Sequence, residues 1–220
     1  MRKYIYSIFL LGLFSCQEEG VVQYTQEKDG LQFSANSSED MTKVFNFATA
    51  TYEEEINGEP KTFYYGDSLA AYTFERVVLD LQGFPTPDER EYKLKTVLVE
   101  DQDSSKVAEV VFEPYYSLAP NQLKDTIKIT VLRPKTRGTY TVGITVDTEG
   151  KGAFFDKGVV EKSILRLDIK DVYEQPEGWD ERQEWLGEFD EEKYAFMVTV
   201  SKQAFSKENN HMWNETDKYN

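Results

Sequence analysis

The sequence predicts a mainly β protein: an antiparallel immunoglobulin-like β-sandwich followed by a small, partly helical C-terminal segment. Three observations predict this fold. Short segments between residues 31 and 171 alternate apolar and polar residues with the period of a half-buried strand. Gly, Pro, Asp and Lys fill the turns between these segments. No convincing helical pattern occurs among them, and a closed barrel is the alternative arrangement for the same strands.

Each expected strand places its apolar residues on one face, which would be buried. The clearest is residues 139–147, in which large apolar side chains face threonines and a glycine. In residues 92–101, Tyr92, Leu94 and Leu98 are expected to share the buried face. The other segments with this alternation are residues 44–52, 75–83, 125–134 and 163–171.

Composition changes after residue 171, where all three tryptophans and the only histidine lie. Two helix starts are expected in this part of the chain. Asp180 is expected to cap a turn that runs to Leu186 and ends at Gly187. Asp190 begins a second helix, through about residue 202, because it is followed by two glutamates and acids favour the positive end of a helix. We therefore divide the chain into residues 1–15, 16–30, 31–171 and 172–220.

Residues 1–15 have the features of a secretory signal peptide. Arg2 and Lys3 form a positive start, and residues 4–14 are an apolar run. A membrane-spanning helix needs about 20 apolar residues, so this run is too short to be a permanent anchor. Ser15 and Cys16 then complete a sequence that resembles the lipobox of bacterial lipoproteins. The resemblance implies cleavage between them and a membrane anchor of acyl chains on the cysteine.

The residues after Cys16 carry a weaker targeting signal. Gln17, Glu18 and Glu19 resemble the acid-rich export signal of Bacteroidota lipoproteins. This resemblance implies a location on the outer membrane facing the cell exterior, and the periplasmic face is the alternative. Residues 16–30 are expected to form a polar, flexible tether between the anchor and the folded part.

The formal charge of −15 excludes one class of partner. Removal of residues 1–15 takes away two cations and no acids, which makes the charge −17. No basic stripe offsets this total, and phosphate backbones would be repelled. We therefore expect no nucleic-acid partner, and the acidity is typical of a soluble surface.

The sequence predicts no catalytic residues, no metal site and no cofactor. The only histidine, His211, lies close to the end of the sequence, and lipidation would block the only cysteine, Cys16. A zinc site needs several such ligands. Residues 101–112 begin like an EF-hand loop but have Lys106 and Phe112 where its glycine and glutamate are required. Pairs of acids are abundant, so a carboxylate-based enzyme stays open as an alternative.

Two pairs of adjacent tyrosines are candidate ligand-facing residues. Tyr64 and Tyr65 form the first pair, and Tyr115 and Tyr116 form the second. Adjacent residues of a strand point to opposite faces, so one member of each pair is expected to point outward, where it could stack on a sugar. Packing in the core is the alternative role of such side chains.

Several segments together resemble a family of uncharacterised Bacteroidota surface lipoproteins, of the domain of unknown function 4843 type. The segments are the lipobox, "VVLDLQGFPTPDEREYKL", "FFDKG" and a final "W…LGEFDEEKYAFM". The resemblance implies an immunoglobulin-like amino half and a C-terminal segment with a conspicuous pattern. The residues of that pattern here are Trp179 or Trp185, then Gly187, Phe189, Lys193 and Tyr194. It also implies an association with outer-membrane nutrient import.

These observations predict a non-enzymatic, lipid-anchored outer-membrane protein. Its expected partners are the membrane, through acyl chains on Cys16, and a glycan, a peptide or a subunit of an import complex. A structural adhesin or fimbria-like subunit is one alternative, which would require self-association through an added strand. A carbohydrate-active enzyme or peptidase is the other, and it would require a cleft with two facing acids.

Overall fold

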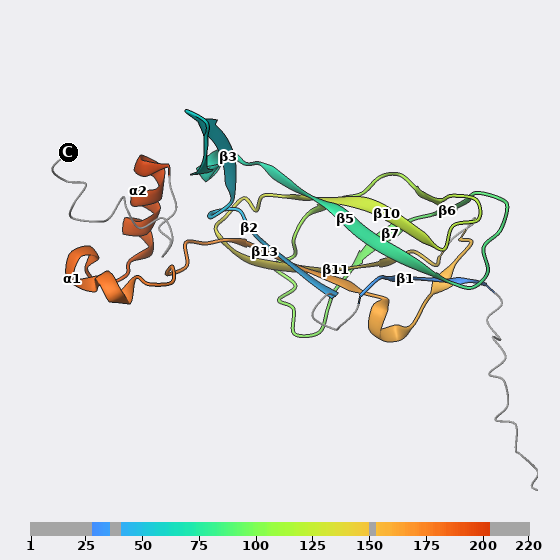
Figure 1. The fold of residues 1–220 in the computed structure, drawn as a ribbon. Coiled ribbons are helices and arrows are strands. Elements are labelled where there is room, and N and C mark those ends of the chain that lie inside the picture. Colours follow the sequence, from blue (N-terminus) through green and yellow to red (C-terminus); the bar gives the residue numbers. More distant parts are fainter. Residues whose placement is uncertain (1–27, 36–40, 150–152, 203–220) are drawn as a thin grey trace, which may run out of the picture.

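The computed structural model describes residues 28–35, 41–149 and 153–202, which form an elongated β-sandwich with a helical cap at one end (Figure 1). The first sheet has the strand order β12-β1-β5-β10-β8. Its strands are β1 (Gly30–Phe33), β5 (Ala71–Gln82), β8 (Val110–Val111), β10 (Lys124–Leu132) and β12 (Asp156–Lys157). The second sheet has the order β2-β13-β11-β7. Its strands are β2 (Thr42–Asn46), β7 (Leu94–Val97), β11 (Gly138–Val146) and β13 (Leu165–Asp171).

Two two-stranded sheets and several short helices complete the described structure. One is the hairpin of β3 (Thr51–Ile56) with β4 (Glu59–Tyr64), and the other pairs β6 (Arg90–Tyr92) with β9 (Tyr116–Leu118), which are not consecutive strands. The 3₁₀ helices are η2 (Gly66–Ser68), η3 (Val160–Lys162) and η4 (Asp180–Arg182), and the α-helices are α1 (Gln183–Leu186) and α2 (Glu191–Ser201). The predicted fold class is therefore confirmed. Most strand pairs are antiparallel, but β1 pairs with β12 and β2 with β13 in parallel.

The main core lies between the two sheets and is built by the alternating strands. In β10, Ile127, Ile129 and Val131 are buried, as their spacing predicts. The same holds for the apolar residues of β5 and β13. Because a strand of period two buries every second residue, each strand contributes one face to a continuous apolar layer.

Two predicted strands are each broken in two. Residues 44–52 were expected to form one strand, but β2 ends at Asn46. The Asn46 side chain accepts a hydrogen bond from the backbone N–H of Ala48 (3.1 Å) and donates one to the carbonyl of Val172 (3.0 Å). This turn directs Phe47 into the main core and Ala48 into a second core cluster.

The expected strand at residues 92–101 is divided between two sheets. β6 pairs with β9, whereas β7 pairs with β11, so the chain changes partners at Lys93. The carbonyl of Lys93 accepts a hydrogen bond from the backbone N–H of Asp147 at that corner. Leu98 follows the end of β7 and is 62% exposed, so its predicted place on the buried face was wrong.

The helical cap, residues 179–201, packs around Trp179, which is fully buried in the second core cluster together with Ala48, Tyr64 and Tyr173. The indole Nε1 donates to the carbonyl of Gly187 (3.1 Å), and the ring packs edge-on against Phe189 and Tyr194. Trp185, by contrast, is 63% exposed. Of the two tryptophans left open by the sequence, Trp179 is therefore the one around which the rest of the C-terminal pattern gathers.

The ends of the two cap helices follow the sequence closely. The Asp190 carboxylate accepts from the backbone N–H of Lys193 (2.8 Å) and caps α2, as predicted. Gly187 ends α1 with a positive φ of 71°, which a glycine adopts without strain. Asp180 does not cap the first turn, because its carboxylate accepts from the Gln175 side chain instead. Among the described helices, none is long and apolar enough to cross a membrane.

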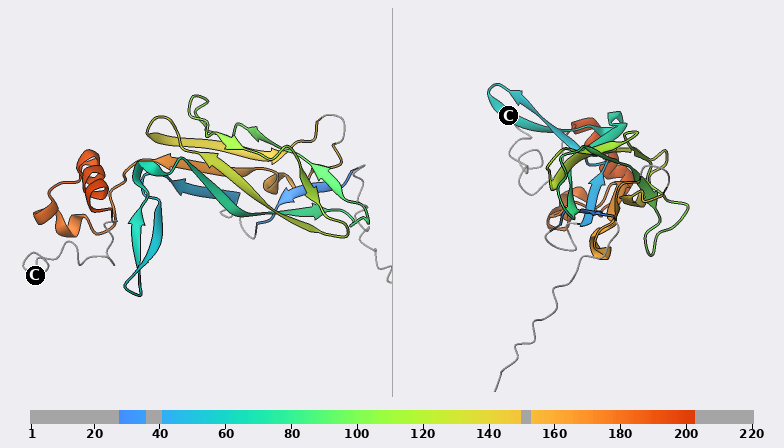
Figure 2. Two further views of the ribbon diagram at one scale, coloured as in Figure 1. Left: turned by 90° about the horizontal axis from the view of Figure 1, so that it is seen from above. Right: turned by 90° about the vertical axis from the view of Figure 1, so that its right-hand side faces the viewer.

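The sandwich has two distinct ends, which β5 connects. Its twelve residues span about 40 Å at ~3.3 Å per residue. At one end, which we call the Gly30 end, Gln82 pairs with Gly30, where β1 begins. At the other, which we call the cap end, Ala71 pairs with Leu132. The helical cap and the β3–β4 hairpin both lie at the cap end, far from the start of β1 (Figure 2).

Candidate functional site

Several predicted residues lie outside the described part of the chain. They are Ser15, Cys16, Gln17, Glu18 and Glu19 in the N-terminal region and His211 near the other terminus. The expected cleavage, lipidation and export therefore stay predictions.

The two tyrosine pairs each have one exposed and one buried member. Tyr65 and Tyr115 are 37% and 56% exposed, whereas Tyr64 and Tyr116 are 6% and 8% exposed. Tyr64 belongs to the second core cluster, and burial raises the pKa of its hydroxyl well above the usual range. Tyr116 stacks on Tyr92 in the main core. Tyr64 and Tyr116 are therefore core residues, the alternative role given above, and only Tyr65 and Tyr115 of the four candidates could face a ligand.

The two exposed tyrosines lie at opposite ends of the sandwich. Tyr65 follows β4 and lies at the cap end. Tyr115 precedes β9, whose partner β6 is held at the Gly30 end by an ion pair between Arg90 and Asp29 (2.6 Å). The structure does not bring these tyrosines together, so they belong to separate surfaces.

A cleft of about 410 Å³ lies beside Tyr115 and is the candidate binding site. We call it the aromatic cleft. It lies between the two-stranded β6–β9 sheet and the segments on either side of residues 150–152. Its lining residues are Glu91, Tyr92, Lys93, Tyr115, Val146, Asp147, Glu149, Ala153, Phe154 and Phe155.

The floor of the aromatic cleft is formed by buried side chains and its rim is exposed. Tyr92 and Phe155 are buried and meet edge to face, with their ring centroids 6.2 Å apart. The Tyr92 hydroxyl donates to Asp125 (2.6 Å). Burial is the larger cause, and this hydrogen bond the second, of a Tyr92 pKa far above the usual range. At the rim, Phe154 is 54% exposed, close to the value for Tyr115. Two aromatic rings therefore border the cleft and still contact solvent.

Sequence reasoning missed Phe154, although a signal for it was present. Phe154 and Phe155 are adjacent aromatic residues, as are the members of the tyrosine pairs. One points outward and the other, at 1% exposure, points inward. The rule applied to the tyrosines would have identified this pair as well.

One wall of the aromatic cleft carries an ion pair that keeps a carboxylate charged. Lys95 Nζ lies 3.0 Å from Asp147 Oδ1 and 3.2 Å from Glu149 Oε1. The hydrogen bond to Asp147, and to a smaller extent the one to Glu149, raises the pKa of Lys95. In turn, the hydrogen bond from Lys95 lowers the pKa of Asp147. Asp147 is therefore ionised at neutral pH and can accept hydrogen bonds from a ligand. Its pKa is shifted in the direction opposite to that of a general acid.

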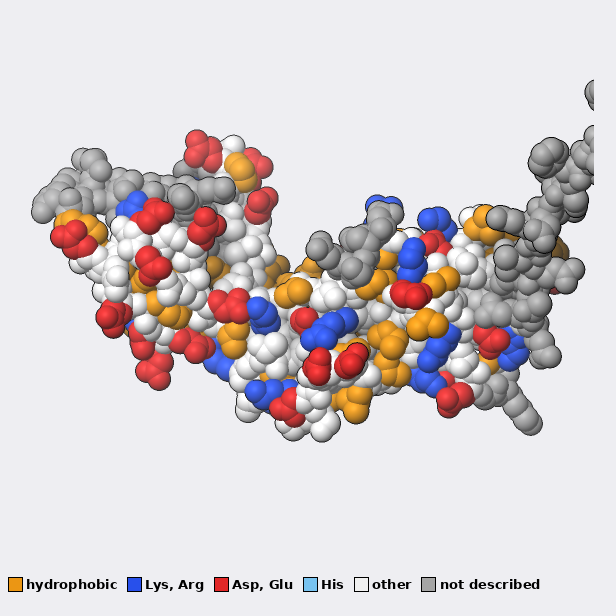
Figure 3. Space-filling model, turned by 90° about the horizontal axis from the view of Figure 1, so that it is seen from below, with side chains coloured by type: hydrophobic (Ala, Val, Ile, Leu, Met, Phe, Trp, Pro, Cys, Tyr) orange, Lys and Arg blue, Asp and Glu red, His pale blue; other side chains and the backbone are white. Residues whose placement is uncertain are grey.

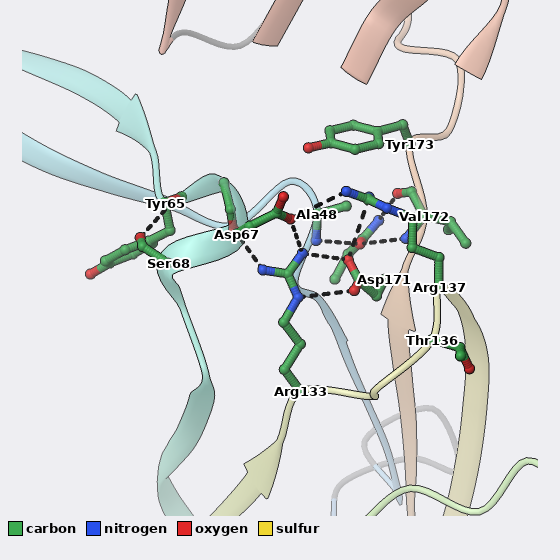
Figure 4. Close-up of polar contacts among 12 residues, drawn as sticks. Ala48, Tyr65, Asp67, Ser68, Arg133, Thr136, Arg137, Asp171, Val172 and Tyr173 are labelled. Carbon is green, nitrogen blue, oxygen red and sulfur yellow. Dashed lines mark hydrogen bonds and ion pairs between the residues drawn. The ribbon is translucent and has the colours of Figure 1, made fainter. Parts of the chain in front are cut away.

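A second polar cluster, at the cap end, has a structural role (Figure 4). Arg133 donates from Nε and Nη2 to both carboxylate oxygens of Asp171 (2.9 and 2.8 Å) and from Nη1 to the carbonyl of Gly66 (2.8 Å). Arg133 also pairs with Asp67 (2.9 Å), to which Arg137 is bound as well (3.2 Å). The bond to Asp171 raises the pKa of Arg133. These charges are matched within the cluster, which joins η2 to the ends of β10 and β13.

The described residues contain no group of three or more His, Cys, Asp or Glu side chains that could hold a metal ion. Near residues 101–106, the Asp103 carboxylate accepts from the backbone N–H and the hydroxyl of Ser105, and these bonds lower its pKa. The carboxylate oxygen of Asp103 is thus engaged within its own loop.

A family model described as "Domain of unknown function (DUF4843)" matches residues 67–203. This range contains Tyr115, Phe154 and Trp179, and it begins after the β3–β4 hairpin. No curated protein matches the chain.

Among solved structures, the apo form of the Calx CBD1 domain matches with 11% identity and a TM-score of 0.38, over 66% of this chain and 98% of that one. Bacteroides thetaiotamicron EndoBT-3987 with its Man5GlcNAc product matches with 10% identity and a TM-score of 0.37, over 64% of this chain and 30% of that one. The Bacteroides ovatus GH5 xyloglucanase in complex with a XXXG heptasaccharide matches with 13% identity and a TM-score of 0.31, over 68% of this chain and 22% of that one.

Proposed function

The chain belongs to the DUF4843 family, whose description states no activity, and we propose that it is a lipid-anchored glycan-binding protein of the bacterial outer membrane. The protein would bind its glycan in the aromatic cleft without cleaving it and would serve as an accessory of a nutrient-import system. The observation that carries this proposal is the pair of exposed rings, Tyr115 and Phe154, at the rim of a cleft with charged walls.

The chemistry of the aromatic cleft suits a neutral oligosaccharide. One face of a pyranose ring presents C–H groups, which pack on an aromatic side chain, while its hydroxyls donate to carboxylates. The cleft supplies both kinds of partner. Tyr115 and Phe154 are the aromatic rings, and Asp147, Glu149 and Lys93 are the charged groups of the lining. Three acids in the lining and a chain charge of −15 would repel an acidic polysaccharide.

The ionised state of Asp147 supports binding without cleavage. Glycosidases need one carboxylic acid that stays protonated to near neutral pH, together with a second carboxylate across the bond. The bond from Lys95 lowers the pKa of Asp147 and so favours the charged form. An ionised carboxylate is an acceptor for sugar hydroxyls and cannot protonate a leaving group at neutral pH.

The position of the aromatic cleft agrees with an anchor at Cys16. The chain enters the described structure at Lys28, at the same end as the cleft. Lys28 lies twelve positions after Cys16, and an extended chain of this length reaches about 40 Å. The cleft would therefore lie within a few tens of ångströms of the membrane, where a transporter could receive the sugar.

We expect Tyr115→Ala and Phe154→Ala to weaken binding of neutral oligosaccharides about tenfold each, because each removes one stacking ring. Titration calorimetry with gluco-, manno- and xylo-oligosaccharides of different lengths measures this. Phe84→Ala is the matched control, since Phe84 is 74% exposed but does not line the cleft. Unchanged affinity in both cleft variants would place the binding elsewhere, and shortened oligosaccharides after incubation would favour the enzyme alternative.

We expect Cys16→Ala to release the protein from the membrane fraction, because no acyl chain can be attached to alanine. Fractionation of the cells followed by detection of the protein measures this. Labelling with a radioactive fatty acid distinguishes lipidation from adsorption, and Ser105→Ala, which leaves the signal unchanged, is the control. A variant that stays in the membrane fraction without the cysteine would contradict the anchor.

A further inference from the structure

The β3–β4 hairpin stands out from the sandwich at the cap end, opposite the aromatic cleft (Figures 1 and 2). Its two-residue turn, Asn57 and Gly58, has positive φ values of 56° and 84°, which are typical of a tight hairpin turn. An isolated two-stranded hairpin is marginally stable in water. Its base is fixed by Tyr64, whose ring lies in the second core cluster and whose N–H donates to the carbonyl of Lys202 (3.0 Å).

The bond from Tyr64 to Lys202 shows which backbone groups point out of the hairpin. Tyr64 pairs with Thr51, and its N–H points away from β3. In an antiparallel pair, residues alternate between inward and outward hydrogen-bonding groups. By the register of the hairpin, the backbone groups of Glu53 and Glu55 therefore point outward along the free side of β3.

The two sides of the hairpin differ in their capacity to accept another strand. On the β4 side, Pro60 occupies an outward position and has no N–H, and Tyr64 already donates to Lys202. The β3 side has no such obstruction. The hairpin is a two-stranded sheet of its own, so no strand of the described part of the chain covers this side.

The negative charge of β3 indicates which kind of strand could pair with its free side. Glu53, Glu54 and Glu55 are consecutive and exposed, and acidic side chains gather on the projecting hairpin (Figure 3). Edge strands are commonly protected by charge, and three acids would repel a second copy of a chain whose charge is −15. A basic segment would meet the complementary charge. It would also find Tyr52 packed against Phe63 and Tyr65 on one face of the hairpin.

We propose that the free side of β3 accepts an extended, Lys- or Arg-rich segment of a partner protein as an additional strand. Backbone groups of Glu53 and Glu55 bind its main chain, and their carboxylates pair with basic side chains at every second position. The residues between these face Tyr52. The site lies about 40 Å from the aromatic cleft, since β5 separates the two ends, and it is independent of glycan binding.

The test uses the full chain purified in detergent and the peptide Ac-KVKVKVKV-NH2, measured by fluorescence anisotropy at low and high salt. We expect binding that weakens with salt, and amide shifts at Glu53 and Glu55 in NMR spectra. Glu53→Gln/Glu55→Gln is expected to weaken binding about tenfold at low salt, because two charge pairs are lost. Glu161→Gln/Glu177→Gln removes the same charge at two exposed positions outside the hairpin and is the matched control.

A second variant tests the backbone contribution separately from charge. Glu55→Pro removes an outward N–H without removing a bond inside the hairpin, and it is expected to abolish peptide binding while the Tyr64 amide signal is retained. Equal binding of the block peptide Ac-KKKKVVVV-NH2 would overturn strand addition, because charge alone would then suffice. Absence of binding, or dimers in sedimentation experiments that compete with the peptide, would overturn the proposed partner.

Discussion

Trp179→Ala is expected to destabilise the helical cap by about 3–5 kcal/mol, the range measured when a buried tryptophan is truncated. The indole is fully buried and packs against Phe189 and Tyr194. Its Nε1 also donates to the carbonyl of Gly187, so the variant leaves both a cavity and an unpaired acceptor. Because the second core cluster is separate from the main core, we expect the cap to unfold at a lower urea concentration than the sandwich.

Trp185→Ala is the matched control for this prediction. It removes the same side chain from the same cap, but at a position that is 63% exposed. We expect its effect to be below about 1 kcal/mol, as for most surface substitutions. Urea titration followed by circular dichroism, combined with limited proteolysis of the cap, measures both variants. A larger effect at Trp185 than at Trp179 would contradict the assignment of the second core cluster.

Arg133→Met and Asp171→Leu are each expected to lower the free energy of unfolding by about 3–5 kcal/mol, because each takes away the two-bonded partner of a buried charge. The two side chains are 12% and 5% exposed and form a two-bonded pair. The double variant is expected to recover much of this loss, since neither charge is then buried alone. Arg133→Lys is not conservative here, because an ammonium group cannot reproduce the paired geometry.

Thermal and urea unfolding of the two single variants and the double variant give the coupling energy directly. Arg137→Met is the control, because Arg137 contacts the same acids but is 42% exposed. We expect it to change stability by less than about 1 kcal/mol. Additive effects of Arg133→Met and Asp171→Leu would show that the two side chains do not depend on each other.

The strands that sequence reasoning predicts well are those buried on one face throughout. In β13, Leu165, Leu167 and Ile169 alternate with polar residues, and each is at most 2% exposed. The break between β2 and β3 could not be predicted in this way. It depends on bonds from the Asn46 side chain to Val172, 126 residues away in the sequence.

The β3–β4 hairpin had a strong local signal that a search for alternation does not use. Asn57 and Gly58 are the residues that a tight hairpin turn requires. The three glutamates at positions 53–55 interrupt the alternation of apolar and polar residues in β3. A hairpin that projects into solvent has no buried face, so it does not need this alternation. Alternation indicates a strand with one buried face, so it does not identify strands that project into solvent.

The candidate site was predictable only in part, for a related reason. Tyr115 belongs to a pair of adjacent aromatic residues. The sequence predicted that one member of the pair would be exposed, but not which one. The contact between Lys95 and Asp147 joins residues 52 positions apart, at the point where β7 and β11 pair. Such a contact follows from strand register, which the sequence of either segment alone does not contain.

The position of β1 between β5 and β12 bears on how the protein would withstand force. A molecule held by its N-terminal end and by a partner at the cap end is under tension along the sandwich. Pulling at Lys28 acts along the axis of β1, so the hydrogen bonds to β5 and β12 are loaded together in shear rather than opened one at a time. The ion pair between Arg90 and Asp29 lies just outside this strand and shares the load. The sandwich would therefore resist a force applied at Lys28 through two rows of hydrogen bonds at once.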